Sequence, residues 1–286
     1  MNRLHAMVLP FVDTYTLTLP PACAEASAGR HRRGRGLLGN FICFWLVFLL
    51  VLSYVTAVPA EELLVAAASD LVYAFQRMEK PFGDAHGVKI KWIFGSSGML
   101  STQIQGGLGV DLFASASPEW VDRLQEKGLV IEKNRKVFAL GRIAMCTPKE
   151  AKLSVEKLED LVGPRIGKIS IANPAHAPYG VAAKEALEKM GIWERVKPKM
   201  VYGENVLQAQ TYIKRGEVDA GIIALSLTDF LEIRCSALSS DLHNPIRQTI
   251  AVLKRSEKKE LAQKFVDFLG GREGVSILGK YGFFRP

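Results

Sequence analysis

Short apolar runs alternate with amphipathic segments from residue 62 to the end of the chain. Residues 63–68 form a continuous apolar run of strand length, and after Ser69 apolar residues recur every three to four positions, which predicts a helix. A regular alternation of strand and helix predicts an α/β fold with largely parallel sheets. Helices are expected to begin near residues 69, 99, 118, 180, 204 and 256. Further strands are expected at residues 88–94, 111–114, 142–147, 168–172, 199–202, 219–225 and 248–253.

Four turns that join a predicted strand to a predicted helix contain small or polar residues and neither lysine nor arginine. They are Ser69 and residues 96–98, 178–180 and 205–206. In open α/β sheets, ligands bind at the carboxyl ends of strands, where the first N–H groups of helices point outward. Such neutral donors suit a fully ionised oxyanion, because all of its oxygens are acceptors. One such turn is usually an ordinary helix cap, but four in one chain favour an anion site.

The first 60 residues follow a different pattern. A cationic cluster at residues 30–35 precedes an apolar run at 41–55, and small residues follow at 57–60. This order predicts a secretory signal that is cleaved before Glu61, which places the mature protein in the periplasm. The apolar run is shorter than the ~20 residues of a membrane-spanning helix, and a retained membrane anchor is the alternative.

Charge and cysteine content limit the classes of partner that the protein is expected to bind. The formal net charge is +8, but 32 of the 37 basic and 27 of the 29 acidic residues lie after residue 60. There the two signs alternate along predicted helices, which favours solvated surfaces over a nucleic-acid patch. No spacing of histidine, cysteine and carboxylate residues predicts a metal site. Cys146 and Cys235 are expected to be free, partly buried thiols, with one disulfide as the alternative.

Six short motifs occur in order along the chain after residue 62. They are residues 65–69 (VAAAS), 94–98 (FGSSG), 111–116 (DLFASA), 173–180 (NPAHAPYG), 184–187 (KEAL) and 280–283 (KYGF). Together they resemble the periplasmic molybdate-binding proteins of ABC importers, from about residue 62 to the C-terminus. The resemblance implies a type II periplasmic binding protein with two α/β lobes, two crossover hinge strands and a central cleft. Residues 61–137 and 247–286 would form the first lobe and 138–246 the second, after an extension and signal at 1–60.

The same resemblance implies a ligand and a set of binding residues. Ser69 and Ser97 would provide hydroxyl and backbone donors from the first lobe. Tyr179 and Val206 would provide backbone N–H groups from the second lobe. The ligand would be molybdate or tungstate, held without a cofactor and without catalysis by a monomer that delivers it to the transmembrane permease subunits.

Two residues at or near the predicted anion site have side chains that would not donate a hydrogen bond to the ligand. Where the best-known family members have a tyrosine whose hydroxyl binds the oxyanion, this chain has Ala224, so one contact is missing or replaced. Asp70 follows Ser69 directly, and we expect its side chain to point away from the anion and to stabilise the first helical turn.

Two other functions are compatible with the sequence. The first is a receptor for another tetrahedral oxyanion, such as sulfate or thiosulfate. The second is an exported serine hydrolase. Neither Ser69 nor Ser97 has a histidine or lysine nearby in the sequence to act as a base, which disfavours the hydrolase.

Overall fold

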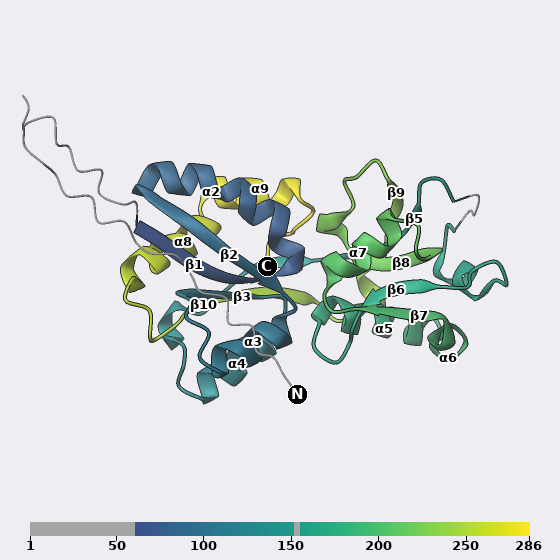
Figure 1. Ribbon diagram of the computed structural model, residues 1–286, viewed down its shortest axis with the longest axis horizontal. Helices are drawn as coiled ribbons and strands as arrows, with labels where there is room; N and C mark the ends of the chain where they lie inside the picture. Colours follow the sequence, from purple (N-terminus) through teal and green to yellow (C-terminus); the bar gives the residue numbers. More distant parts are fainter. Residues whose placement is uncertain (1–60, 152–154) are drawn as a thin grey trace, which may run out of the picture. The chain divides into compact units, whose positions relative to one another are not determined.

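The alternating apolar segments form two five-stranded sheets flanked by helices (Figure 1). The computed structural model describes residues 61–151 and 155–286. The predicted signal sequence therefore lies outside the described residues. Within them, no helix combines the length and the apolar character needed to cross a bilayer.

The first sheet has the strand order β2-β1-β3-β10-β4 and builds the first lobe. Its strands are β1 (Glu61–Ala68), β2 (Val88–Gly95), β3 (Leu112–Ser115), β4 (Lys136–Gly141) and β10 (Ile246–Val252). Its helical segments are η1 (Ser69–Leu71), α2 (Val72–His86), α3 (Ser97–Gln105), α4 (Pro118–Glu126), η2 (Glu132–Asn134), α8 (Lys259–Gly270) and α9 (Arg272–Lys280).

The second sheet has the order β7-β6-β8-β5-β9 and builds the second lobe. Its strands are β5 (Ile143–Pro148), β6 (Ile169–Ala172), β7 (Met200–Gly203), β8 (Ala220–Ala224) and β9 (Ile233–Ala237). Its helical segments are η3 (Leu158–Val162), α5 (Pro178–Lys189), α6 (Trp193–Val196), η4 (Lys197–Lys199), α7 (Val206–Lys214), η5 (Leu225–Leu227) and η6 (Ser240–Leu242).

The chain crosses between the two sheets twice. The single residue Arg142 separates β4 from β5, and residues 238–245 lead from β9 back to β10. The boundaries expected at 137/138 and 246/247 fall inside β4 and β10, because both strands continue to the crossing points.

The prediction of largely parallel sheets is wrong. β1 pairs in parallel with β2 and β3, and β6 with β7 and β8, but β10 and β5 are antiparallel to both of their neighbours. The physical reason is the double crossing. β5 and β10 enter their sheets directly from the other lobe, without the crossover helix that a parallel connection needs.

Apolar side chains cover both faces of the first sheet. Helices α2, α8 and α9 gather on one side of it, and α3 and α4 on the other (Figure 1). On the first side, Phe265 of α8 makes edge-on ring contacts with Phe75 and Phe82 of α2. Offset and edge-on aromatic pairs of this kind add to the free energy of burial and fix the helices on the sheet.

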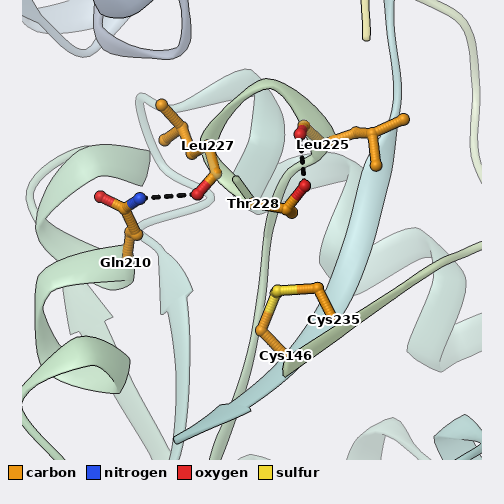
Figure 2. The surroundings of a disulfide bond; sticks show 6 residues. All are labelled: Cys146, Gln210, Leu225, Leu227, Thr228 and Cys235. Carbon is orange, nitrogen blue, oxygen red and sulfur yellow. Dashed lines mark hydrogen bonds between the residues drawn. A yellow bond between two sulfur atoms is a disulfide. The ribbon is translucent and has the colours of Figure 1, made fainter. Parts of the chain in front are cut away.

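The two cysteines of the described chain form a disulfide, which corrects the expectation of free thiols. Cys146 and Cys235 lie directly opposite each other on the neighbouring strands β5 and β9 (Figure 2). Their Cα atoms are 4.1 Å apart. Residue spacing could not reveal this pairing, because β9 was not predicted and its register with β5 is a tertiary property.

We predict that the disulfide stabilises the second lobe. The bond closes a loop with a sequence separation of 89 residues, and loss of such a bond typically costs about 2–5 kcal/mol. Replacement of both Cys146 and Cys235 by alanine should lower the free energy of unfolding by that amount in urea titrations. Reductant should lower the stability of the wild type to the same level and leave the double variant unchanged. Equal stability of oxidised wild type and double variant would contradict this role.

Candidate functional site

The four turns singled out in the sequence meet at one small cavity, whose volume of about 10 Å³ leaves room for about one water molecule. Residues from the first lobe line one side and residues from the second lobe the other. Ser69, Ser97, Tyr179 and Val206 are all among them. The full lining is Ala68, Ser69, Asp70, Gly95, Ser96, Ser97, Ala116, Ala177, Pro178, Tyr179 and Val206.

Helix α3 presents a free serine hydroxyl and a free N–H group to this cavity. Ser96 is its N-cap, and the Ser96 Oγ accepts from the N–H of Met99. The fully buried Ser97 Oγ accepts from the N–H of Ala116 at 3.0 Å. Because that bond fills an acceptor position of the oxygen, the hydroxyl proton of Ser97 is available to another acceptor. No hydrogen bond within the described residues uses the Ser97 N–H.

Helices α5 and α7 each present a further free N–H group from the second lobe. In α7, the N-cap Asn205 Oδ1 accepts from Leu207 and Gln208, so the N–H of Val206 is left over. In α5, Pro178 at the first position has no N–H, and the N–H of Tyr179 has no acceptor in the described chain. The first N–H groups of a helix carry partial positive charge, so both helices contribute positive electrostatic potential at the cavity, which favours an anion.

Ser69 does not cap a helix as the sequence suggested. It is the first residue of η1, and no side-chain cap bond is formed there. Its side chain is only 3% exposed, and its hydroxyl has no hydrogen-bond partner among the described residues. The serine at this strand–helix junction therefore lines the cavity and does not cap a helix.

The cavity is lined by no lysine, arginine or histidine, and its one carboxyl group is Asp70. Asp70 is 1% exposed, and its Oδ2 accepts from Gln248 Nε2 at 2.6 Å. The side chain thus turns to β10 and not to the first helical turn, where we expected it. Burial raises the pKa of Asp70 to about 7, against hydrogen bonds from Tyr179 and Gln248 that lower it.

The Tyr179 phenol lies beside the same carboxyl group. Gln248 Nε2 donates to the Tyr179 hydroxyl oxygen at 3.3 Å. Burial, followed by the negative charge of Asp70, raises the pKa of Tyr179 well above its usual range, so the phenol keeps its proton. A Cβ atom at Gly141 would collide with the phenol oxygen, which places this hydroxyl against the end of β4, where the chain crosses between lobes.

Further contacts join the two sides of the cavity. The His176 carbonyl accepts from the N–H of Gly98 at 2.9 Å, and His176 Nδ1 lies 2.9 Å from Ser96 Oγ. A Cβ atom at Gly98 would lie 2.8 Å from both His176 and Trp120, so the close approach of the lobes requires glycine there. Ser226 Oγ donates to the main-chain oxygen of Asp70 at 2.8 Å.

These bridging residues were not predicted as functional. His176 stands inside the motif at residues 173–180, but it was not singled out from the sequence. Gln248 had no signal of its own, because the polar residues Arg247 and Thr249 flank it in β10. Nothing in the sequence pointed to Ser226, because its partner Asp70 is 156 positions away.

The free N–H and hydroxyl groups of the lining residues are donors of the kind that suits an anion. Neither Ser69 nor Ser97 has a hydrogen bond to a basic side chain. No cluster of three or more metal-ligating side chains occurs in the described part of the chain.

Comparison with known proteins places the chain in a family. The model of a family described as bacterial extracellular solute-binding proteins matches residues 63–284. The chain belongs to this family. YvgL of Bacillus subtilis, named as a substrate-binding lipoprotein of an ABC transporter, is 30% identical over 77% of this chain and 85% of its own length. The molybdate-binding protein ModA of Rhodobacter capsulatus is 28% identical over 82% of this chain and 92% of its own.

Solved structures confirm the two-lobed α/β fold of a solute-binding protein. The periplasmic molybdate-binding protein of Azotobacter vinelandii superposes with a TM-score of 0.73 at 24% identity, over 78% of this chain and 99% of that one. The resemblance inferred from the six motifs is thereby confirmed at the level of family and fold.

In this solute-binding protein, Ala224 is fully buried at the end of β8 and has no polar side chain to offer. It pairs with Ile143, two residues beyond Gly141, against which the Tyr179 hydroxyl lies. A phenol from α5 therefore comes close to the strand pair where the family tyrosine was expected.

Proposed function

We propose that this solute-binding protein captures molybdate or tungstate outside the cytoplasm and delivers it to the transmembrane subunits of an ABC importer. Three unaccepted N–H groups, at Ser97, Tyr179 and Val206, converge with the hydroxyls of Ser69 and Ser97 on one cavity without a cation. This donor set is the main support for the proposal. The names of relatives such as the ModA proteins point to the same ligand.

The donors favour a fully ionised tetrahedral anion. Each oxygen of such an anion accepts hydrogen bonds and brings no proton of its own. Helix N-termini stabilise the negative charge without the desolvation cost of a buried lysine or arginine. The protein would act by binding, as a monomer without a cofactor and without nucleic acid.

The two serine hydroxyls are the first test of the site. Ser69→Ala removes one donor to a desolvated dianion, and hydrogen bonds to charged groups are worth about 1.5–3 kcal/mol. We expect molybdate to bind about tenfold more weakly or worse in calorimetric titrations, and Ser97→Ala to lose at least as much.

Ser101→Ala is the matched control, because Ser101 is an equally buried serine of α3 whose hydroxyl donates to the Trp120 carbonyl outside the cavity. Parallel titrations with sulfate and phosphate test the anion class. Wild-type molybdate affinity in both Ser69→Ala and Ser97→Ala would move the site elsewhere.

The Tyr179 hydroxyl is proposed to replace the contact that Ala224 cannot make. Gln248 donates to the phenol oxygen, so the single hydrogen of the phenol is left for one acceptor, either the Asp70 carboxyl group or the anion. Tyr179→Phe keeps the ring and the backbone N–H and should weaken molybdate binding about tenfold. Tyr202→Phe, at a half-exposed tyrosine of β7, should have no effect. An unchanged titration for Tyr179→Phe would mean that water fills the space instead.

The site requires export, which we propose to occur through the signal at residues 30–60. Cleavage after Ala60 would release a soluble periplasmic protein that begins at Glu61. Intact-mass measurement of the exported protein should therefore give the mass of residues 61–286. A species that retains residues 41–55 would instead indicate a membrane-anchored receptor.

A further inference from the structure

Asp70 presents an electrostatic problem for an anion site. Asp70 is one of the residues that line the cavity, its carboxyl group is buried, and no cation lies beside it in the described chain. An ionised carboxylate here would repel a bound dianion in a medium that screens charge poorly.

Within residues 61–151 and 155–286, no basic side chain acts on the Asp70 carboxyl group, and those of the neighbouring elements are engaged elsewhere or exposed. Lys214 of α7 pairs with Glu232 at 3.6 Å. Arg142, next to the end of β4, stacks over the ring of Phe284 at 4.8 Å. Arg247 of β10 is exposed, on the opposite side of the strand from Gln248.

The other titratable groups around Asp70 are two tyrosines and one histidine. The phenol of Tyr73, at the start of α2, interacts with Gln210 and Glu232. His176 faces Ser96 across the cavity rim. Only Tyr179, from α5, faces the carboxyl group directly.

The hydrogen-bonded pair of Asp70 and Gln248 contains acceptors that lack a donor. Asp70 Oδ1 and Gln248 Oε1 are both buried acceptors without a donor in the described chain. Buried acceptors in proteins are nearly always satisfied. The Tyr179 hydroxyl has only one hydrogen, which it can give either to Asp70 or to an anion in the cavity.

We infer that Asp70 is the proton-carrying residue of the anion site, so that capture of a dianion is coupled to uptake of one proton by the Asp70 carboxyl group. The proton comes from solvent and binds a carboxylate oxygen, which leaves Asp70 neutral. The Tyr179 hydroxyl is then free to turn its hydrogen from Asp70 to the anion. This inference rests on the proposed function, because it assumes a fully ionised ligand.

The pKa of Asp70 in the unliganded protein decides how the affinity for the anion changes with pH. Burial already brings the pKa of Asp70 to about 7, and a bound dianion would raise it further. Below pH 7 the proton is in place before the ligand arrives, so the affinity is independent of pH. Above pH 7 each captured anion must draw one proton from solvent, so the affinity falls about tenfold per pH unit.

The test is a calorimetric titration of sodium molybdate into the protein expressed from its full coding sequence, between pH 5.5 and 9, where molybdate stays a dianion. The molybdate affinity of the wild type should show a break near pH 7, constant below that pH and falling above it. At pH 8, titrations in two buffers with different heats of ionisation should show uptake of about one proton per anion, and at pH 5.5 none. This measurement needs no variant, so it decides the inference even if Asp70 variants fold poorly.

Asp70→Asn provides the matched variant, since asparagine has the shape of a neutral aspartic acid. It should lose the break and bind molybdate more tightly than the wild type at pH 9. His176→Gln should keep the break, which separates Asp70 from the histidine on the rim. Absence of proton uptake at pH 8, or an unaltered break in Asp70→Asn, would overturn the inference while molybdate binding itself stands.

The proposed function would fail in a different way. Hydrogen phosphate carries its own proton and could donate it to an ionised Asp70. Tighter binding of phosphate than of molybdate at pH 8, or no molybdate binding at any pH, would overturn the proposed function and the inference with it.

Discussion

The need to place free helix N–H groups at one point governs the arrangement of both lobes. A helix leaves its first N–H groups unpaired, and burial of such groups costs free energy unless an acceptor is supplied. Here Ser97, Tyr179 and Val206 lie at the starts of three helices from the two lobes, and all three residues line the same cavity. The caps Ser96 and Asn205 satisfy the neighbouring N–H groups. The N–H groups of Ser97, Tyr179 and Val206 remain without an acceptor in the described chain, so a bound ligand could accept from them.

The connection between the lobes uses the same few residues. Gln248 stands on β10, one of the two strands at the crossing points, and donates both to Asp70 of the first lobe and to Tyr179 of the second. Ser226 and His176 of the second lobe add further bonds to the first. Because these contacts surround the cavity, a change in the relative position of the lobes would alter them and the anion site together. Under the proposed function, binding of the anion would therefore be linked to the relative position of the lobes.

In the second lobe, a disulfide and two hydrogen bonds restrain the segments next to the contacts between the lobes. The disulfide joins β5 to β9, and the η5 turn that follows β8 is held nearby by hydrogen bonds from Gln210 to the Leu227 carbonyl and from Thr228 to the Leu225 carbonyl (Figure 2). Ser226 lies inside this turn and reaches Asp70. A rigid turn positions the serine hydroxyl for the contact across the lobes, in the way that a supporting shell holds a binding residue in place.

The sequence by itself determined the α/β class, most of the strands and helices, and the four turns that supply the site. Apolar periodicity and helix-start signals are local, so they can be read from neighbouring residues. The tertiary structure decided the mixed direction of the sheets, the disulfide, the free hydroxyl of Ser69 and the environment of Asp70. Each of these depends on partners far away in the chain, such as Gln248, which lies 178 positions from Asp70. Burial and long-range pairing set the protonation of a carboxyl group and the direction of a hydroxyl proton, and no local pattern of residues encodes them.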